Sequence, residues 1–179
     1  MKNNALGFTL VDVLISTFIL SILLTLMNIT YSAVNNYWAT EETRAALYTG
    51  FITAKTQAMI SGQSTVICPS SDGMNCLSNP VWQYGWIIFQ DDNHNRERDF
   101  DEMTLVKQPA LSTGITLRSN QGRPRLVFQQ NGSNGGTNAT FTYCNHNDVE
   151  HAINFIISNT ARIRTASADP NLAEQTCNL

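Results

Sequence analysis

The sequence predicts an α+β fold in which one long N-terminal helix packs against an antiparallel β-sheet. No proline precedes Pro69, and helix-forming residues continue past the apolar start of the chain, so residues 8–61 are predicted to form one helix. Gly62 is expected to end it, and only short runs of β-branched and aromatic residues follow. A helix followed only by short strands implies a sheet over its second half. About 115 residues follow the helix, enough for one core.

The first element is an apolar run of twenty residues from Phe8 to Met27, FTLVDVLISTFILSILLTLM. It holds fourteen large apolar residues, no glycine or proline, and one charge at Asp12. Because this length suffices to cross a hydrocarbon layer, residues 8–30 are predicted to form a transmembrane helix. An isolated carboxylate in such a helix costs roughly 3 kcal/mol, so Asp12 is expected to have a partner.

The polar leader MKNNAL and Gly7 precede the apolar run. A secretory signal peptide places its small-residue cleavage site after the apolar run, whereas here the small residue comes first. Cleavage after Gly7 would remove a leader of residues 1–7, keep the helix, and place Asp12 four residues from a new amine on Phe8. An ordinary signal anchor is the alternative interpretation.

The run Gly7-Phe8-Thr9-Leu10-Val11-Asp12 resembles the leader and processing site of type IV pilins and type II secretion pseudopilins. The resemblance implies that a prepilin peptidase cuts after Gly7 and methylates the amine of Phe8. It also implies that Asp12 is the carboxylate needed for assembly. In the family this residue is usually Glu, one methylene longer than the Asp found here.

Residues 31–62 are predicted to form the amphipathic second half of the helix. Two apolar stripes lie on it. The first consists of Val34, Trp38, Ala45, Tyr48, Ile52 and Met59, and the second of Leu47, Phe51 and Ala58. Either both stripes are core under the sheet, or part of them packs on neighbouring subunits.

Residues 63–179 are predicted to form a periplasmic β-rich domain. Its expected strands are residues 65–68, 86–89, 104–106, 115–118, 125–128, 140–144 and 152–157. The pairs Asn131-Gly132 and Gly135-Gly136 indicate a hairpin turn between two of them.

Four cysteines, Cys68, Cys76, Cys144 and Cys177, follow the apolar helix. In the pilin orientation they face the oxidising periplasm, which favours disulfides, and four cysteines permit three pairings. We favour Cys68 with Cys76, closing a short loop, and Cys144 with Cys177, holding the C-terminal tail. A zinc site with His146 and His151 is the alternative, but no C-x-x-C pair is present.

An ordered set of motifs extends the resemblance over the whole chain. They are Cys68-Pro69-Ser70 with Asp72-Gly73 and Cys76, Trp82 with Gly85-Trp86, Phe89 and Asp91, Phe128 with Gly132, Thr140 with Cys144, and Ile156-Ile157-Ser158 with Arg162-Ile163-Arg164. This set resembles the GspH/FimT family of type IV minor pilins and type II secretion pseudopilins, and is FimT/FimU-like.

The resemblance implies a type IV pilin-like fold and a structural role in type IV pilus assembly or in a type II secretion pseudopilus. The implied partners are the prepilin peptidase, major and minor pilins of a filament or tip complex, and the inner membrane. The implied location is the bacterial inner membrane, with one span and a periplasmic C-terminal domain, and then the pilus or pseudopilus.

Arginines gather in the C-terminal part of the chain. Arg162 and Arg164 are two residues apart, as are Arg123 and Arg125, and in a strand such pairs project to one face. Arginine pairs bind phosphate bidentately. FimT-type pilins used in natural transformation carry a similar Gly-Arg-x-Arg tail, although here Ala161 replaces the glycine. The tail therefore suggests a receptor for double-stranded DNA, and the alternative is a solvated edge strand.

An acidic loop runs from Asp91 to Glu102, with six acidic and two basic residues. Asp91, Asn93, Asn95 and Glu102 occupy positions one, three, five and twelve of an EF-hand-like calcium loop, but Arg96 stands where the turn requires glycine. A hairpin with solvated carboxylates is the favoured interpretation, and calcium the minority alternative.

No catalytic motif is present in the sequence. It has no G-x-S-x-G run and no phosphate loop, and the three histidines lie in separate polar contexts. We therefore expect a protein that is not an enzyme and that needs no cofactor.

Overall fold

The computed structural model describes residues 9–135 and 138–178, leaving the side chains of residues 26–30 and 32–33 undescribed. The chain divides into two compact units, Met1–Ala39 and Thr40–Leu179. Helix α1 (Leu10–Ser61) contributes to both. Gly62 follows it with φ +69°, and its N–H donates to the carbonyl of Ala58, so this glycine ends the helix as expected.

The first unit consists of the N-terminal part of α1. Every large apolar side chain described between Leu10 and Leu24 is at least 44% exposed. Thr9 and Asp12 cap the helix reciprocally. The Asp12 carboxylate accepts the N–H of Thr9 at 3.0 Å and its hydroxyl at 2.7 Å, while the N–H of Asp12 donates to the Thr9 hydroxyl. Within the part of the chain that the structure describes, no helix combines the length and apolar character needed to cross a membrane.

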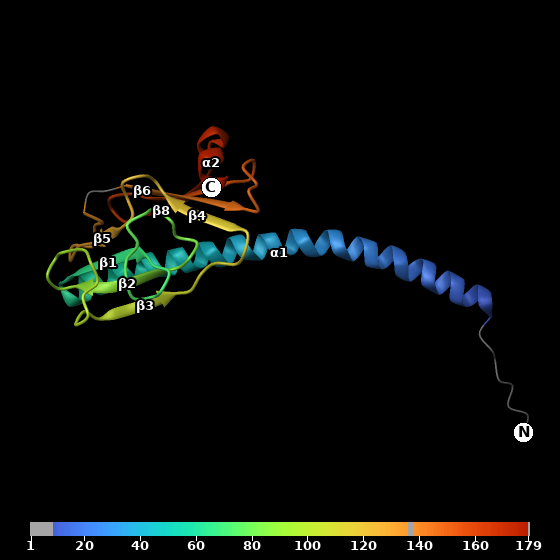
Figure 1. Cartoon of the computed structure of the whole chain (residues 1–179), viewed down its shortest axis with the longest axis horizontal. Coiled ribbons are helices and arrows are strands. Elements are labelled where there is room, and N and C mark those ends of the chain that lie inside the picture. Colours follow the sequence, from blue (N-terminus) through green and yellow to red (C-terminus); the bar gives the residue numbers. More distant parts are fainter. Residues whose placement is uncertain (1–8, 136–137, 179) are drawn as a thin grey trace, which may run out of the picture. The chain divides into compact units, whose positions relative to one another are not determined.

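The second unit contains two antiparallel four-stranded sheets beside the C-terminal part of α1 (Figure 1). The first sheet has the order β3-β2-β1-β5, with β1 (Ser64–Pro69), β2 (Trp86–Asp91), β3 (Thr104–Gln108) and β5 (Leu126–Phe128). The second has the order β4-β6-β7-β8, with β4 (Ile115–Ser119), β6 (Ala139–Asn145), β7 (Ile153–Ile157) and β8 (Ile163–Ser167). The predicted α+β fold is confirmed, but the sheet is divided in two.

The connection between β5 and β6 differs from its prediction. These strands belong to different sheets, so they do not pair with each other as a hairpin. Gly132 and Gly135 have φ of +76° and +65°, which explains the turn signals without a hairpin. Gly136 lies outside the described residues.

A C-terminal helix, α2 (Pro170–Cys177), was not expected from the sequence. Asp169 caps it by accepting the N–H of Asn171 at 2.9 Å, and Pro170 occupies its first turn. The Asp-Pro pair was the signal that predicts this helix start. Ala173 and Cys177 are buried against Cys144 and Ala152.

Phe51 of α1 joins the two sheets. Its ring centroid lies 6.5 Å from that of Phe128 on β5 and 5.5 Å from that of Phe141 on β6. Trp82 extends this aromatic cluster, with ring centroids 4.9 Å from Phe141 and 6.3 Å from Trp86. The core therefore lies between both sheets and one face of α1.

Only one of the two predicted apolar stripes faces this core. Leu47, Phe51 and Ala58, the second stripe, are at most 2% exposed. The first stripe is exposed, at 53% for Tyr48 and 54% for Met59, so its assignment to the core was wrong. The helix face under the sheets also carries the buried small residues Gly50, Ala54 and Ala58, and a Cβ on Gly50 would lie 3.4 Å from the Trp86 indole nitrogen.

Candidate functional site

The candidate functional residues lie in four places: the N-terminus, the disulfides, the acidic loop and the C-terminal arginines. Gly7 and Phe8 lie outside the described residues. The Asp12 carboxylate accepts both donors of Thr9, and its predicted contact with an amine on Phe8 involves a residue outside the described part. The carboxylate thus satisfies two donors at the helix start.

Two disulfides occur, Cys68–Cys76 and Cys144–Cys177, in the pairing favoured from the sequence. Their sulfurs are therefore unavailable as zinc thiolates, which excludes the proposed zinc set. The two histidines of this zinc alternative have other contacts. His151 pairs with the Asp148 carboxylate at 2.9 Å, and the His146 ring packs against Gly114. Hydrogen bonds from His151 hold the pKa of Asp148 below its usual range.

Backbone N–H groups of the acidic loop donate hydrogen bonds to the loop's own carboxylates. Asp91 accepts the N–H of Arg96 at 3.1 Å, and the Glu102 carboxylate accepts the N–H groups of Asp92 and Asp99, each at 3.0 Å. Asp91 is only 1% exposed and Glu102 only 5%, so the expectation that these carboxylates are solvated was wrong. Amide donors compensate for the burial of Glu102 and of Asp91 Oδ2, whereas Asp91 Oδ1 is buried without a hydrogen-bond partner.

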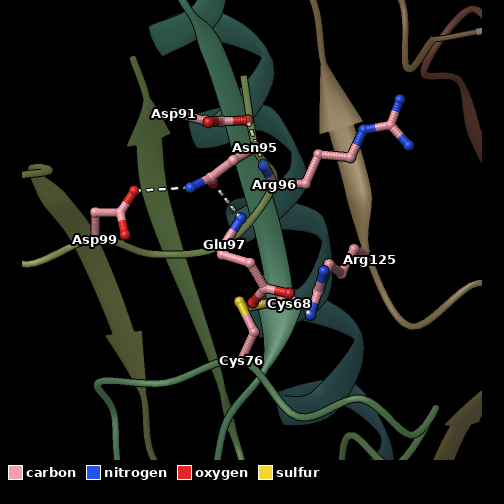
Figure 2. Close-up of polar contacts among 8 residues, drawn as sticks. All are labelled: Cys68, Cys76, Asp91, Asn95, Arg96, Glu97, Asp99 and Arg125. Carbon is pink, nitrogen blue, oxygen red and sulfur yellow. Dashed lines mark hydrogen bonds and ion pairs between the residues drawn. A yellow bond between two sulfur atoms is a disulfide. The ribbon is translucent and has the colours of Figure 1, made fainter. Parts of the chain in front are cut away.

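Asparagines complete the network of the acidic loop. The side-chain amides of Asn93 and Asn95 donate to the Asp99 carboxylate at 2.7 and 2.8 Å, and the Asn95 carbonyl accepts the N–H of Glu97. Figure 2 shows the Arg96 side chain directed away from Asp91. The side chains at the four EF-hand-like positions thus form hydrogen bonds within the loop itself. Among the residues described, no cluster of three or more His, Cys, Asp or Glu side chains is placed to hold a metal ion.

The tip of this loop carries a residue that the motifs did not indicate. Asp99 to Glu102 form a turn closed by the Glu102 N–H on the Asp99 carbonyl at 3.2 Å. Phe100 in that turn is 97% exposed. An aromatic residue between two aspartates was the available signal.

Arg162 and Arg164 lie at one edge of the second sheet, whereas Arg123 and Arg125 lie in the connection from β4 to β5. Arg162 and Arg164 are exposed at β8, where they line a groove of about 680 Å³ with Asn138, Thr140 and Ser158. Arg123 follows β4, the other edge strand, three strand spacings or about 14 Å from β8. The four arginines therefore do not form one patch.

Arg125 is engaged elsewhere. It forms an ion pair with Glu97 of the acidic loop (Figure 2), and its side chain is only 21% exposed. Arg118, which lies on β4, is half-buried. Of the four arginines predicted to bind DNA, only Arg162 and Arg164 are exposed, as contact with DNA phosphates requires.

A family model described as type II transport protein GspH matches residues 44–161, which is more than half of the chain. The chain belongs to the GspH family. The GspH match ends directly before Arg162 and leaves Gly7 to Asp12 outside, so neither the arginine tail nor the processing site is part of it.

Solved structures show the same fold. One is the type IV minor pilin FimU of Pseudomonas aeruginosa, 21% identical with a TM-score of 0.55, covering 78% of this chain and 97% of that one. Another is the minor pseudopilin EpsH from the type 2 secretion system of Vibrio cholerae, 14% identical with a TM-score of 0.50, covering 71% and 95%. No curated protein sequence matched the chain. The predicted type IV pilin-like fold of this GspH-family chain is thus confirmed.

Proposed function

We propose that this GspH-family protein is a structural, non-enzymatic subunit of a type IV pilus or a type II secretion pseudopilus, anchored in the inner membrane by residues 8–30. The observation that carries the proposal is the exposure of every described large apolar side chain from Leu10 to Leu24. Such a surface is unfavourable in water and is stabilised by lipid before assembly and by neighbouring helices in a filament.

Processing is the first test. The full chain is expressed in a host with a prepilin peptidase, and the intact mass of the membrane fraction is measured. The expected mass lacks residues 1–7 and carries one added methyl group on Phe8. Gly7→Val should leave the precursor, whereas Ala5→Ser serves as the matched control and should be processed. A mature N-terminus near Ser32 would instead mean an ordinary signal peptide and contradict the proposal.

Assembly is the second test, and it concerns Asp12. In this proposal its carboxylate, held by Thr9 in the free chain, meets the amine of a subunit added next to it. Asp12→Glu keeps the charge and should enter sheared filaments. Asp12→Ala should be processed normally but remain in the membrane, because the amine loses its counter-charge. Equal recovery of both variants in filaments would remove the role of Asp12.

A second candidate function is binding of double-stranded DNA, favoured by the exposed Arg162 and Arg164 at the β8 edge. If each neutralises one phosphate, the slope of log affinity against log salt should be about −2, and Arg162→Ala/Arg164→Ala should flatten it. Lys107→Ala/Arg123→Ala removes equal charge elsewhere and is the control. The measurement is a titration of labelled duplex with the full chain in detergent at several salt concentrations. Equal slopes for parent and tail variant would leave assembly as the sole function.

A further inference from the structure

The acidic loop presents Phe100 as a protruding side chain on a hydrogen-bonded turn. The bonds of Glu102 and of the two asparagines fix the turn, yet Phe100 is 97% exposed. Asp99 and Asp101 flank it in the sequence. A backbone turn that is fixed before binding loses little conformational entropy on docking, and aromatic side chains are common in binding hot spots.

An apolar groove that could accept the Phe100 ring lies between α1 and β8. It has a volume of about 350 Å³ and is lined by Arg44, Leu47, Tyr48, Phe51, Phe155, Ile163, Arg164 and Thr165. Leu47, Phe51 and Phe155 are buried and form its apolar base, whereas Tyr48 is 53% exposed at its margin. A cavity of about 150 Å³ already accepts a benzene ring, so a phenyl side chain fits here.

The charged residues at the margin of this groove are opposite in sign to those at the Phe100 tip. Arg44 and Arg164 are both exposed at its margin. Arg44 lies 3.4 Å from Glu41 on the same helix, and both side chains are more than a third exposed, so this pair contributes little and can be exchanged for another carboxylate. The tip carries Asp99 and Asp101 next to Phe100 in the sequence, and the groove carries the guanidinium groups of Arg44 and Arg164 beside its apolar base.

We propose that the Phe100 tip of one copy docks in the α1–β8 groove of a second copy of this chain, with the flanking aspartates against Arg44 and Arg164. This inference rests on the proposed filament function and names one of its contacts. The tip belongs to the first sheet and the groove to the edge of the second, so the contact joins two different surfaces. Such a heterologous contact, repeated from copy to copy, builds a closed ring or an open chain of subunits, depending on the rotation between copies.

The test uses the full chain in its native membrane, with the photoreactive phenylalanine analogue p-benzoylphenylalanine at position 100. Irradiation is expected to yield a dimer of this chain, with the crosslink mapped by mass spectrometry to residues 44–51 or 163–165. The same analogue at Met103, which is 63% exposed but lies beyond the tip, should not crosslink to that groove. Intact mass of the same sample reports processing separately.

Charge reversal tests the groove itself. Arg164→Glu should lower the dimer yield at least about fivefold, because it places like charges together. Lys107→Glu makes the same charge change on β3, outside the groove, and should leave the yield unchanged. A crosslink to a different pilin, a crosslink elsewhere on this chain, or no crosslink from a correctly processed protein would each overturn the inference. None of these results would affect the proposed filament function, whose own failure appears as unprocessed protein.

Discussion

Asp72 organises the loop that the Cys68–Cys76 disulfide closes. Its carboxylate accepts the N–H groups of Met74 and Asn75 at 2.8 Å, the Asn75 side-chain amide at 2.8 Å and the Ser70 hydroxyl at 3.1 Å. These donors, the N–H of Asn75 first, hold the pKa of Asp72 well below its usual range. The ionised carboxylate therefore stabilises the folded loop.

The pH dependence of this contribution follows from the depressed pKa. It is fully present above the unfolded pKa of about 4 and is lost as the pH falls through the lower folded value. Asp72→Asn should lower the Tm at pH 7, and the difference from the parent should shrink below about pH 4. Thermal unfolding by circular dichroism at several pH values measures this, with Asp101→Asn as the control at an exposed site. A difference in Tm that does not change with pH would contradict the role of Asp72.

At the scale of elements, α2 depends on its covalent link to β6. The Cys144–Cys177 disulfide closes a segment with a sequence separation of 33, which chain-entropy arguments value at about 3 to 4 kcal/mol. Cys177→Ser should lower the unfolding free energy by about that amount and expose α2 to proteolysis, since Ala173 and Cys177 supply its buried contacts. Denaturant unfolding and limited proteolysis measure the two effects.

A double mutant tests whether the loss of unfolding free energy comes from removing the disulfide. Cys144→Ser should cost as much as Cys177→Ser, and the two together little more, because either removes the same crosslink. Additive losses would mean that the individual side chains, and not the disulfide, stabilise this end of the sheet.

At the scale of the whole molecule, Phe51 is the contact that unites both sheets with α1. Phe51→Ala should lower the unfolding free energy by about 3 to 5 kcal/mol, because it leaves a cavity between Phe128 and Phe141. The next residue supplies a matched control, since Ile52 is 44% exposed and Ile52→Ala should cost less than about 1 kcal/mol. Equal losses would mean that the exposed face of the helix is packed as well.

Several features were predictable because they depend on local chemistry. Gly62 ends α1 through a backbone conformation that glycine adopts most easily, and the seven expected strands follow from β-branched runs. The division into two sheets was not predictable, because turn residues at 131–135 fit a hairpin and a crossover equally well. Which helix stripe faces the core was also undetermined, since Tyr48 and Leu47 are both apolar and only the sheets decide between them.

The candidate sites show the same division between features that the sequence predicts and features that depend on the folded chain. Cysteine pairing followed from compartment and spacing, whereas the burial of Asp91 depends on amide donors whose positions only the folded loop defines. The separation of Arg125 from Arg164 likewise depends on strand order, because it places them on different sheets. Spacing in the sequence identified the arginine pairs but not their distance in space.

The placement of the two disulfides has a mechanical consequence. One lies at the first sheet and the other ties α2 to the second, so neither crosses between the sheets. A tensile load entering through α1 passes to the first sheet through the backbone that joins α1 to β1, and reaches the second sheet through noncovalent contacts that include Phe51 with Phe141 and Thr40 with Tyr143. Under sufficient force the two sheets can part without breaking a covalent bond, while the segment between Cys144 and Cys177 stays looped and inextensible.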